Sequence, residues 1–237
     1  MTQTVTLESA GSAMQLYDSE PEGAPRGAVI VIQEAFGITD HIKDVCHRLS
    51  AEGYRAVAPH LFHRSGDPVI PYDDMAAVMP HIAELSGDGF ESDLAATLGY
   101  LESLGFSPGQ VGVVGFCMGG TFVVFAAAHH TLGAAVTFYG GGIAAGRFGM
   151  PPLVELAPTL ETPWLGLFGD QDQSIPTDEV EAMREEVEKA SVPTEVVRYA
   201  DATHGFNCDA RDSYHEPSAN DGWARMLGWF ADHIVSA

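Results

Sequence analysis

One cysteine in this chain stands where it could act as a nucleophile. Cys117 is the third residue of the segment 115–120, Gly-Phe-Cys-Met-Gly-Gly, which follows an apolar run at 111–114 and precedes a helical run at 121–128. A strand, a sharp turn between small residues and a helix, in this order, form a nucleophile elbow, usually with serine at the centre. The attacking species of a cysteine is its thiolate, whose negative charge a helix N-terminus stabilises. The same segment also fits a buried cysteine in a glycine-rich turn, so its neighbours must decide.

An acid and a base follow Cys117 in the chain. The segment 169–176, Gly-Asp-Gln-Asp-Gln-Ser-Ile-Pro, supplies the acid, and the position three residues after its glycine favours Asp172 over Asp170. His204 stands in the loop segment 201–206, beside a small flexible glycine, and is the candidate base. Nucleophile, acid, histidine is the chain order of the α/β-hydrolase triad. We therefore expect Cys117, Asp172 and His204 to meet in one site.

Other kinds of active site find little support. The other nine histidines, including His60 and His63, are predicted to be surface residues, and no cysteine or carboxylate cluster beside them predicts a metal site. No GxGxxG with a following acidic residue indicates a dinucleotide, so no cofactor is predicted. No G-x-S-x-G segment occurs, and Ser174 lies outside any elbow.

Short apolar runs alternate with amphipathic helical patterns along the chain. The apolar runs predict buried strands at 28–33, 54–58, 111–115, 134–138, 164–168 and 196–199. Helical spacing marks 42–49, 90–101 after a start at Asp88, 180–187 after Pro176, and 223–234, and it makes Cys46 a core residue. The alternation predicts an α/β fold of three layers, a mostly parallel sheet with helices on both faces, in a single domain over residues 1–237.

The composition narrows the partners and the compartment. A formal net charge of −22 disfavours nucleic acid and anionic lipid as partners. The three cysteines form no CxxC pair and their odd number argues against a disulfide framework, which fits a reducing compartment. The first residues show no signal-peptide pattern, so we expect a cytoplasmic protein. The segment 103–146 lacks charged residues, but glycines, a proline and a histidine pair interrupt it, so no membrane span is predicted.

The motifs together resemble the dienelactone hydrolase family, which has the α/β-hydrolase fold. The segment 33–37, Gln-Glu-Ala-Phe-Gly, resembles a family segment after an early strand, and 58–62, Ala-Pro-His-Leu-Phe, resembles a second. The resemblance implies that Cys117 attacks a small ester or lactone and forms a thioester, with His204 and Asp172 completing the triad. It also implies an oxyanion hole from the backbone N–H groups of Met118 and Ala35, and a thiol-activating glutamate, Glu34.

The substrate contacts depart from the family pattern. Family members that act on dienelactone bind its carboxylate with arginines, one of them shortly after the catalytic histidine, where this chain has Cys208. Arg211 and Arg64 are the available replacements; Arg64 lies in the proline-rich segment 62–79, which we expect to shape the substrate entrance. Phe36 and Phe206 are further candidate contacts.

Two other kinds of function stay open beside the thiol hydrolase. A redox or electrophile-responsive thiol protein would use the same Cys117, with Cys208 as resolving partner. A binding module would keep the fold without turnover. The expected partner is a small ester or lactone, and the sequence leaves open whether the protein is a monomer or a homo-oligomer.

Overall fold

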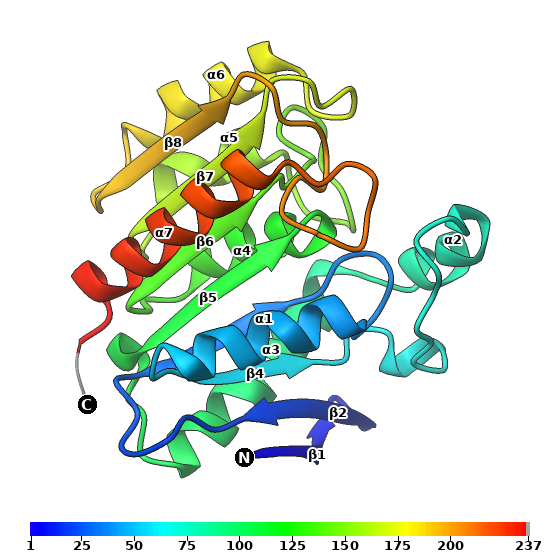
Figure 1. Cartoon of the computed structure of the whole chain (residues 1–237), viewed down its shortest axis with the longest axis vertical. Helices are drawn as coiled ribbons and strands as arrows, with labels where there is room; N and C mark the ends of the chain where they lie inside the picture. Colours follow the sequence, from blue (N-terminus) through cyan, green and yellow to red (C-terminus); the bar gives the residue numbers. More distant parts are fainter. Residues whose placement is uncertain (236–237) are drawn as a thin grey trace.

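The computed structural model describes residues 1–235 and is built around one eight-stranded sheet (Figure 1). The strands are β1 (Thr2–Ser9), β2 (Ser12–Ser19), β3 (Ala28–Ile32), β4 (Arg55–Pro59), β5 (Val111–Phe116), β6 (Ala134–Phe138), β7 (Trp164–Gly169) and β8 (Thr194–Tyr199). Their order across the sheet is β1-β2-β4-β3-β5-β6-β7-β8. Strands β3 to β8 are parallel, and the hairpin of β1 and β2 adds antiparallel strands at one edge.

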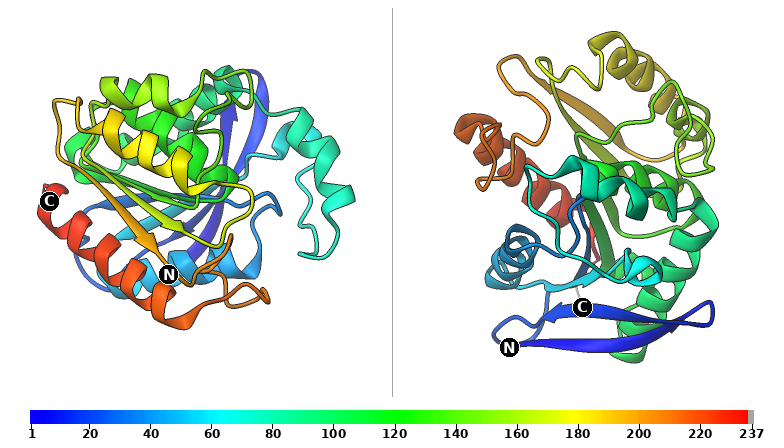
Figure 2. Two further views of the ribbon diagram at one scale, coloured as in Figure 1. Left: turned by 90° about the horizontal axis from the view of Figure 1, so that it is seen from above. Right: turned by 90° about the vertical axis from the view of Figure 1, so that its right-hand side faces the viewer.

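Helices cover both faces of the sheet, which gives the predicted three layers (Figures 1 and 2). The α-helices are α1 (Asp40–Ala51), α2 (Met75–Ala83), α3 (Gly87–Ser103), α4 (Met118–His129), α5 (Leu153–Leu156), α6 (Thr177–Val187) and α7 (Glu216–His233), with 3-10 turns η1 (His63–Ser65), η2 (Pro108–Gln110) and η3 (Ala157–Thr159). Helices α1 and α7 lie on one face and α3, α4 and α6 on the other, while α2 projects beside the sheet.

The uncharged segment 103–146 forms the centre of the protein. It holds the end of α3, then β5, α4 and β6, and every residue of β5 and β6 is buried. A parallel strand covered on both faces needs such a continuous apolar run. No helix within residues 1–235 is both long and apolar enough to cross a membrane.

Most predicted elements are confirmed to within a few residues. The six predicted strands correspond to β3 to β8, and Cys46 is fully buried in α1. The start of α3 was predicted wrongly: Ser86, not Asp88, caps it by accepting a hydrogen bond from the Gly89 N–H (3.1 Å). The hairpin of β1 and β2 was not predicted, because its outer strand is largely exposed and polar.

Candidate active site

Cys117 occupies the sharp turn between β5 and α4, as the elbow motif predicts. Its backbone is strained, with φ 56° and ψ −118°, and its N–H donates to the Phe138 carbonyl (3.0 Å). The flanking glycines are required by close backbone contacts. A Cβ at Gly115 would lie 2.3 Å from the Gly119 carbonyl oxygen, and one at Gly119 would lie 2.4 Å from that of Ile32. Only glycine lets α4 approach β3 and β5 closely enough to hold the thiol at the sheet edge.

Asp172, in the loop after β7, contacts the predicted base directly. The His204 Nδ1–H donates to Asp172 Oδ2 (2.6 Å), and the Ser174 N–H and hydroxyl donate to Asp172 Oδ1 (2.8 and 2.6 Å). Burial opposes ionisation of Asp172, but these hydrogen bonds outweigh it and lower the pKa of the carboxyl. The alternative acid, Asp170, pairs with Arg198 instead (2.6 Å).

His204 has an environment that favours its charged form. Burial disfavours the imidazolium, but the negative charge of Cys117 and the hydrogen bonds with Asp172 and Cys117 outweigh burial and raise the pKa of His204 to about 10. The ring of the fully buried Tyr139 packs edge-on against His204, with centroids 5.2 Å apart. The site therefore favours the imidazolium form of His204.

Met118 and Ala35, the two residues predicted to form the oxyanion hole, line the same pocket as the thiol. Met118 is the first residue of α4, so its N–H has no partner within the helix. Ala35 follows β3, whose carboxyl end pairs with β5 through Ile32 and Gly115. Both residues line the pocket that contains Cys117. Met118, Ala35 and Cys117 thus share one pocket, and the oxyanion role of the two N–H groups stays a prediction.

Glu34 is fully buried rather than facing solvent. Its Oε1 pairs with Arg211 Nη1 (3.4 Å), whereas its Oε2 has no hydrogen-bond partner within residues 1–235. The Arg211 guanidinium also lies 5.6 Å from the Phe36 ring centroid and 5.8 Å from that of Tyr72. Burial opposes the charge of Arg211, but the Glu34 carboxylate outweighs it and raises the pKa of the guanidinium.

A small, mainly apolar pocket of about 230 Å³ is shared by Cys117 and His204. It is lined by Ala35, Phe36, Met75, Ile82, Cys117, Met118, Gly141, Arg147, Phe148, Ser174, His204 and Arg211. A larger, shallower hollow of about 500 Å³ between the N-terminus and α1 contains no triad residue. We place the site in the smaller pocket, because it has a mainly apolar lining with a few convergent polar groups, which is typical of ligand sites.

Two of the predicted substrate contacts lie outside this pocket. Arg64 pairs with the buried Asp93 (2.8 Å), which holds its guanidinium away from the thiol. Phe206 is fully buried and packs against Tyr139, with ring centroids 5.1 Å apart. Phe36 and Arg211 do line the pocket. The proline-rich segment contributes to the wall through Met75, as expected of an entrance.

The prediction that the remaining histidines lie at the surface is wrong for two of them. The side chains of His41 and His63 are each only 2% exposed. His63 Nε2 contacts Asp93 (3.0 Å) in the same cluster that holds Arg64, so its role is structural. His60 contacts Asp67 (2.7 Å) and is likewise a structural residue.

Sequence reasoning missed several pocket residues. Arg147 and Phe148 come from the loop after β6, and a Cβ at Gly141 would lie 3.0 Å from Arg147 Nη1, so a glycine leaves room for this guanidinium. Unlike Arg211, Arg147 makes no ion pair with any residue of the described chain. Ile82 belongs to α2, a helix whose position no local pattern indicates. The glycine run at 140–142 was the only local signal for this wall.

The sheet, the elbow and the order of the loops define an α/β-hydrolase. A model of the dienelactone hydrolase family matches residues 14–234, and the chain belongs to that family. It is accordingly a hydrolase.

Relatives cover nearly the whole chain. A Salmonella typhimurium protein named "Putative carboxymethylenebutenolidase" is 41% identical over 237 residues, which cover 96% of this chain and 86% of that protein. A structure named "Putative Dienelactone Hydrolase from Klebsiella pneumoniae" matches with a TM-score of 0.91 at 39% identity, covering 98% of this chain and 99% of that one. An acylaminoacyl peptidase of Pyrococcus horikoshii shares the fold alone, with a TM-score of 0.77 at 12% identity, covering 99% of this chain and 42% of that one.

Proposed function

We propose that this protein hydrolyses small esters or lactones through a covalent intermediate on Cys117, with His204 as base and Asp172 as its orienting acid. The observation that carries this proposal is the 2.6 Å contact between Asp172 and His204 beside a strained elbow cysteine in one pocket. The volume of about 230 Å³ suits a small substrate. The names of the relatives support the same reaction class.

Acylation begins when the Cys117 sulfur attacks the carbonyl carbon. The carbonyl electron pair moves to the oxygen, which the N–H groups of Met118 and Ala35 bind as it becomes an oxyanion. As the carbonyl re-forms, the bond to the leaving oxygen breaks, and that oxygen takes a proton from the His204 imidazolium. The products of this step are a thioester on Cys117 and an alcohol, or a ring-opened acyl group when the substrate is a lactone.

Deacylation uses the imidazole that acylation leaves neutral. His204 takes a proton from a water molecule, whose oxygen attacks the thioester carbon in the same oxyanion hole. The carbon–sulfur bond breaks, the carboxylic product departs, and the sulfur leaves as a thiolate beside the re-formed imidazolium. Asp172 keeps the imidazole in the required tautomer throughout, through its contact with Nδ1.

Glu34 has a separate role in preparing the nucleophile. Its Oε2 is buried and has no hydrogen-bond partner among the described residues, so it is available to receive the proton of an uncharged Cys117 thiol before attack and to return it to the sulfur after the thioester breaks. Arg211 holds the other carboxylate oxygen and fixes its direction. Glu34→Gln removes the acceptor while keeping the shape, and we expect it to slow acylation.

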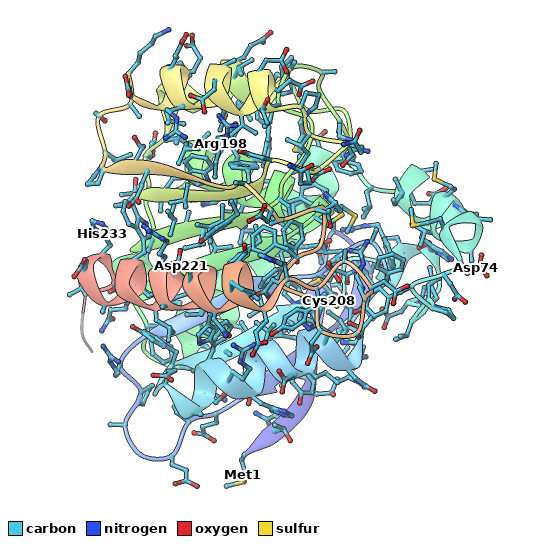
Figure 3. The ribbon with its side chains drawn as sticks, turned by 45° about the horizontal axis from the view of Figure 1, so that its top comes forward. Met1, Asp74, Arg198, Cys208, Asp221 and His233 are labelled. Carbon is cyan, nitrogen blue, oxygen red and sulfur yellow. The ribbon has the colours of Figure 1, made fainter. Side chains whose placement is uncertain are left out.

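The second thiol, Cys208, gives little support to the redox alternative. All three cysteines are unpaired, and Cys208, in the loop after β8, is fully buried (Figure 3). Burial, with the charge of Glu34, raises the pKa of Cys208 to about 11, so the thiol stays protonated and reacts poorly in disulfide exchange. Three unpaired thiols also fit a reducing compartment, and we propose that the protein works in the cytoplasm.

The decisive experiment follows hydrolysis of dienelactone, neutral lactones and p-nitrophenyl acetate by wild type and Cys117→Ala. Cys46→Ala is the matched control, because this cysteine is buried in α1 away from the pocket. We expect turnover to vanish in Cys117→Ala but not in Cys46→Ala. With p-nitrophenyl acetate, whose leaving group needs no proton, we expect His204→Ala to accumulate an acyl-enzyme visible as an added mass. Full activity in Cys117→Ala would refute the proposal.

A further inference from the structure

One face of helix α2 is a continuous apolar arc, with a buried side chain at one side of the arc and an exposed side chain at the other. At about 100° per residue, Val78, Ile82, Met75 and Met79 follow one another across an arc of roughly 100°. Val78 is buried, Ile82 and Met75 line the active-site pocket, and Met79 is 58% exposed. The arc therefore leads from the core, past Cys117, to the surface.

Three of the seven large apolar side chains that are exposed within residues 1–235 lie on the segment of α2 and the loop before it. Val69, Met75 and Met79 are 61%, 51% and 58% exposed, and all three belong to the segment that forms the pocket rim. The backbone next to Val69 is tied to the pocket, because the Ile70 N–H donates to the Phe36 carbonyl (3.0 Å). On a protein with 33 acidic residues, exposed apolar side chains beside a pocket favour a binding role for this segment.

The helix is held in place even though it projects from the sheet (Figures 1 and 3, where Asp74 marks its start). Asp74 caps it by accepting a hydrogen bond from the Ala77 N–H (3.0 Å). At the other end His81 contacts the Ser65 hydroxyl (2.8 Å), and its ring lies 5.5 Å from that of Phe62. These contacts present the apolar arc in a defined direction.

We propose that the strip formed by Val69, Met75 and Met79 binds the hydrocarbon chain of the substrate and gives the enzyme a preference for medium-chain esters. This inference rests on the proposed function and names its substrate class. Met75 belongs both to the strip and to the pocket of Cys117, so the part of a substrate that extends beyond the pocket on this side meets the strip. Met79 lies one helical turn, about 5.4 Å, beyond Met75, so only a chain several carbons long reaches it. Methionine suits this task, since its flexible thioether adapts to varied apolar shapes.

The test measures kcat/KM for p-nitrophenyl esters from acetate to decanoate, and for alkyl acetates, which carry the chain on the alcohol side. Full burial of a methylene is worth about fourfold, and a strip that covers one side gives about twofold. We expect kcat/KM to rise about 15-fold over four methylenes in one of the two series. In the acyl series this is the step from butanoate to octanoate, and in the alkyl acetate series it is the step from butyl to octyl. A flat dependence in both series, with acetate still turned over through Cys117, would overturn this inference and leave the proposed function intact.

Variants locate the effect on α2. Met79→Gln is expected to lower the octanoate-to-acetate ratio about fivefold, and Met79→Leu to retain most of it. The matched control is Leu104→Gln, a 41% exposed leucine just after α3. An unchanged ratio in Met79→Gln would contradict the assignment.

A second readout does not depend on turnover. We expect 1-octanol, but not 1-butanol, to slow alkylation of Cys117 by iodoacetamide in wild type, and Met79→Gln to lose this protection. If no ester is hydrolysed, the proposed function fails. The protection of Cys117 by 1-octanol would still show whether the strip binds a hydrocarbon chain. Sedimentation of wild type and Met79→Gln tests whether a second copy of the chain covers the strip instead. A wild-type dimer that Met79→Gln converts to a monomer would assign the strip to that second copy and refute the substrate role.

Discussion

Replacing Gly119 by alanine tests whether the elbow positions the nucleophile through backbone contact. The added Cβ would lie 2.4 Å from the Ile32 carbonyl oxygen and 2.6 Å from that of Gln33. The first distance is about 1 Å shorter than the 3.4 Å at which ordinary contact begins. Both oxygens belong to backbone, so no side-chain rotation relieves the overlap.

The strain must separate α4 from the end of β3 by about 1 Å. That displacement moves Cys117 and the Met118 N–H relative to Ala35, the other residue of the proposed oxyanion hole. A misplacement of about 1 Å costs about 100-fold in rate, and overpacking of this kind costs roughly 1–3 kcal/mol of stability. We therefore expect Gly119→Ala to stay folded while losing about two orders of magnitude in kcat.

The assay compares ester hydrolysis and thermal unfolding of Gly119→Ala with those of Gly99→Ala. Gly99 lies on the exposed side of α3, and a Cβ added there would meet no other atom within 4 Å. Alanine is the better helix former by about 0.8–1 kcal/mol, so this control should raise the Tm with unchanged activity. If Gly119→Ala retained wild-type kcat, the close contact with β3 would not be what positions the thiol.

Three further predictions concern charges in the site. Asp172→Asn should lower kcat roughly 10⁴-fold with the fold retained, since the imidazole loses its tautomer; a loss below tenfold would contradict this role. The pKa of His204, about 10 against an ordinary 6.5, makes its stabilising contribution full below pH 6.5 and absent once pH has risen through about 10. Cys117→Ser should lower this pKa, followed by NMR of the ring, and reduce the fall in Tm on the alkaline side; an unchanged titration would show that Cys117 does not raise the pKa of His204. Arg147→Gln should lower kcat/KM about tenfold for esters that carry a carboxylate and leave neutral esters unaffected, with Arg26→Gln as control; equal losses on both substrates would refute a charge-specific role.

The triad residues could be predicted because they depend on local rules. Cys117 is marked by glycines around a strand–helix turn, and Asp172 and His204 each follow a recognisable strand. In a parallel sheet the carboxyl ends of neighbouring strands meet at one edge, so three distant loops converge without further information. The buried position of Glu34, at the end of β3, follows from the same geometry.

The pocket walls could not be predicted, because their positions depend on contacts between distant segments. Arg64 was a reasonable substrate ligand by its place in the entrance segment, yet the buried carboxylate of Asp93 binds it from α3. Arg147 gave no signal, since its approach to the pocket depends on room above Gly141. A buried charge takes the nearest partner of opposite sign, and which partner is nearest is a property of the tertiary structure.

The close backbone contacts of the elbow also divide the protein into parts that can and cannot vary. Gly115 and Gly119 join β3, β5 and α4 so tightly that almost any side chain there disturbs the reaction itself. Apart from the residues of the elbow and of the proposed mechanism, the pocket is lined mainly by α2 and the loop after β6, two segments that can change while the sheet stays as it is. A library confined to positions 69–82 and 143–148 would therefore explore new substrates on an unaltered catalytic frame, and the same separation gives natural selection a route from one ester to another.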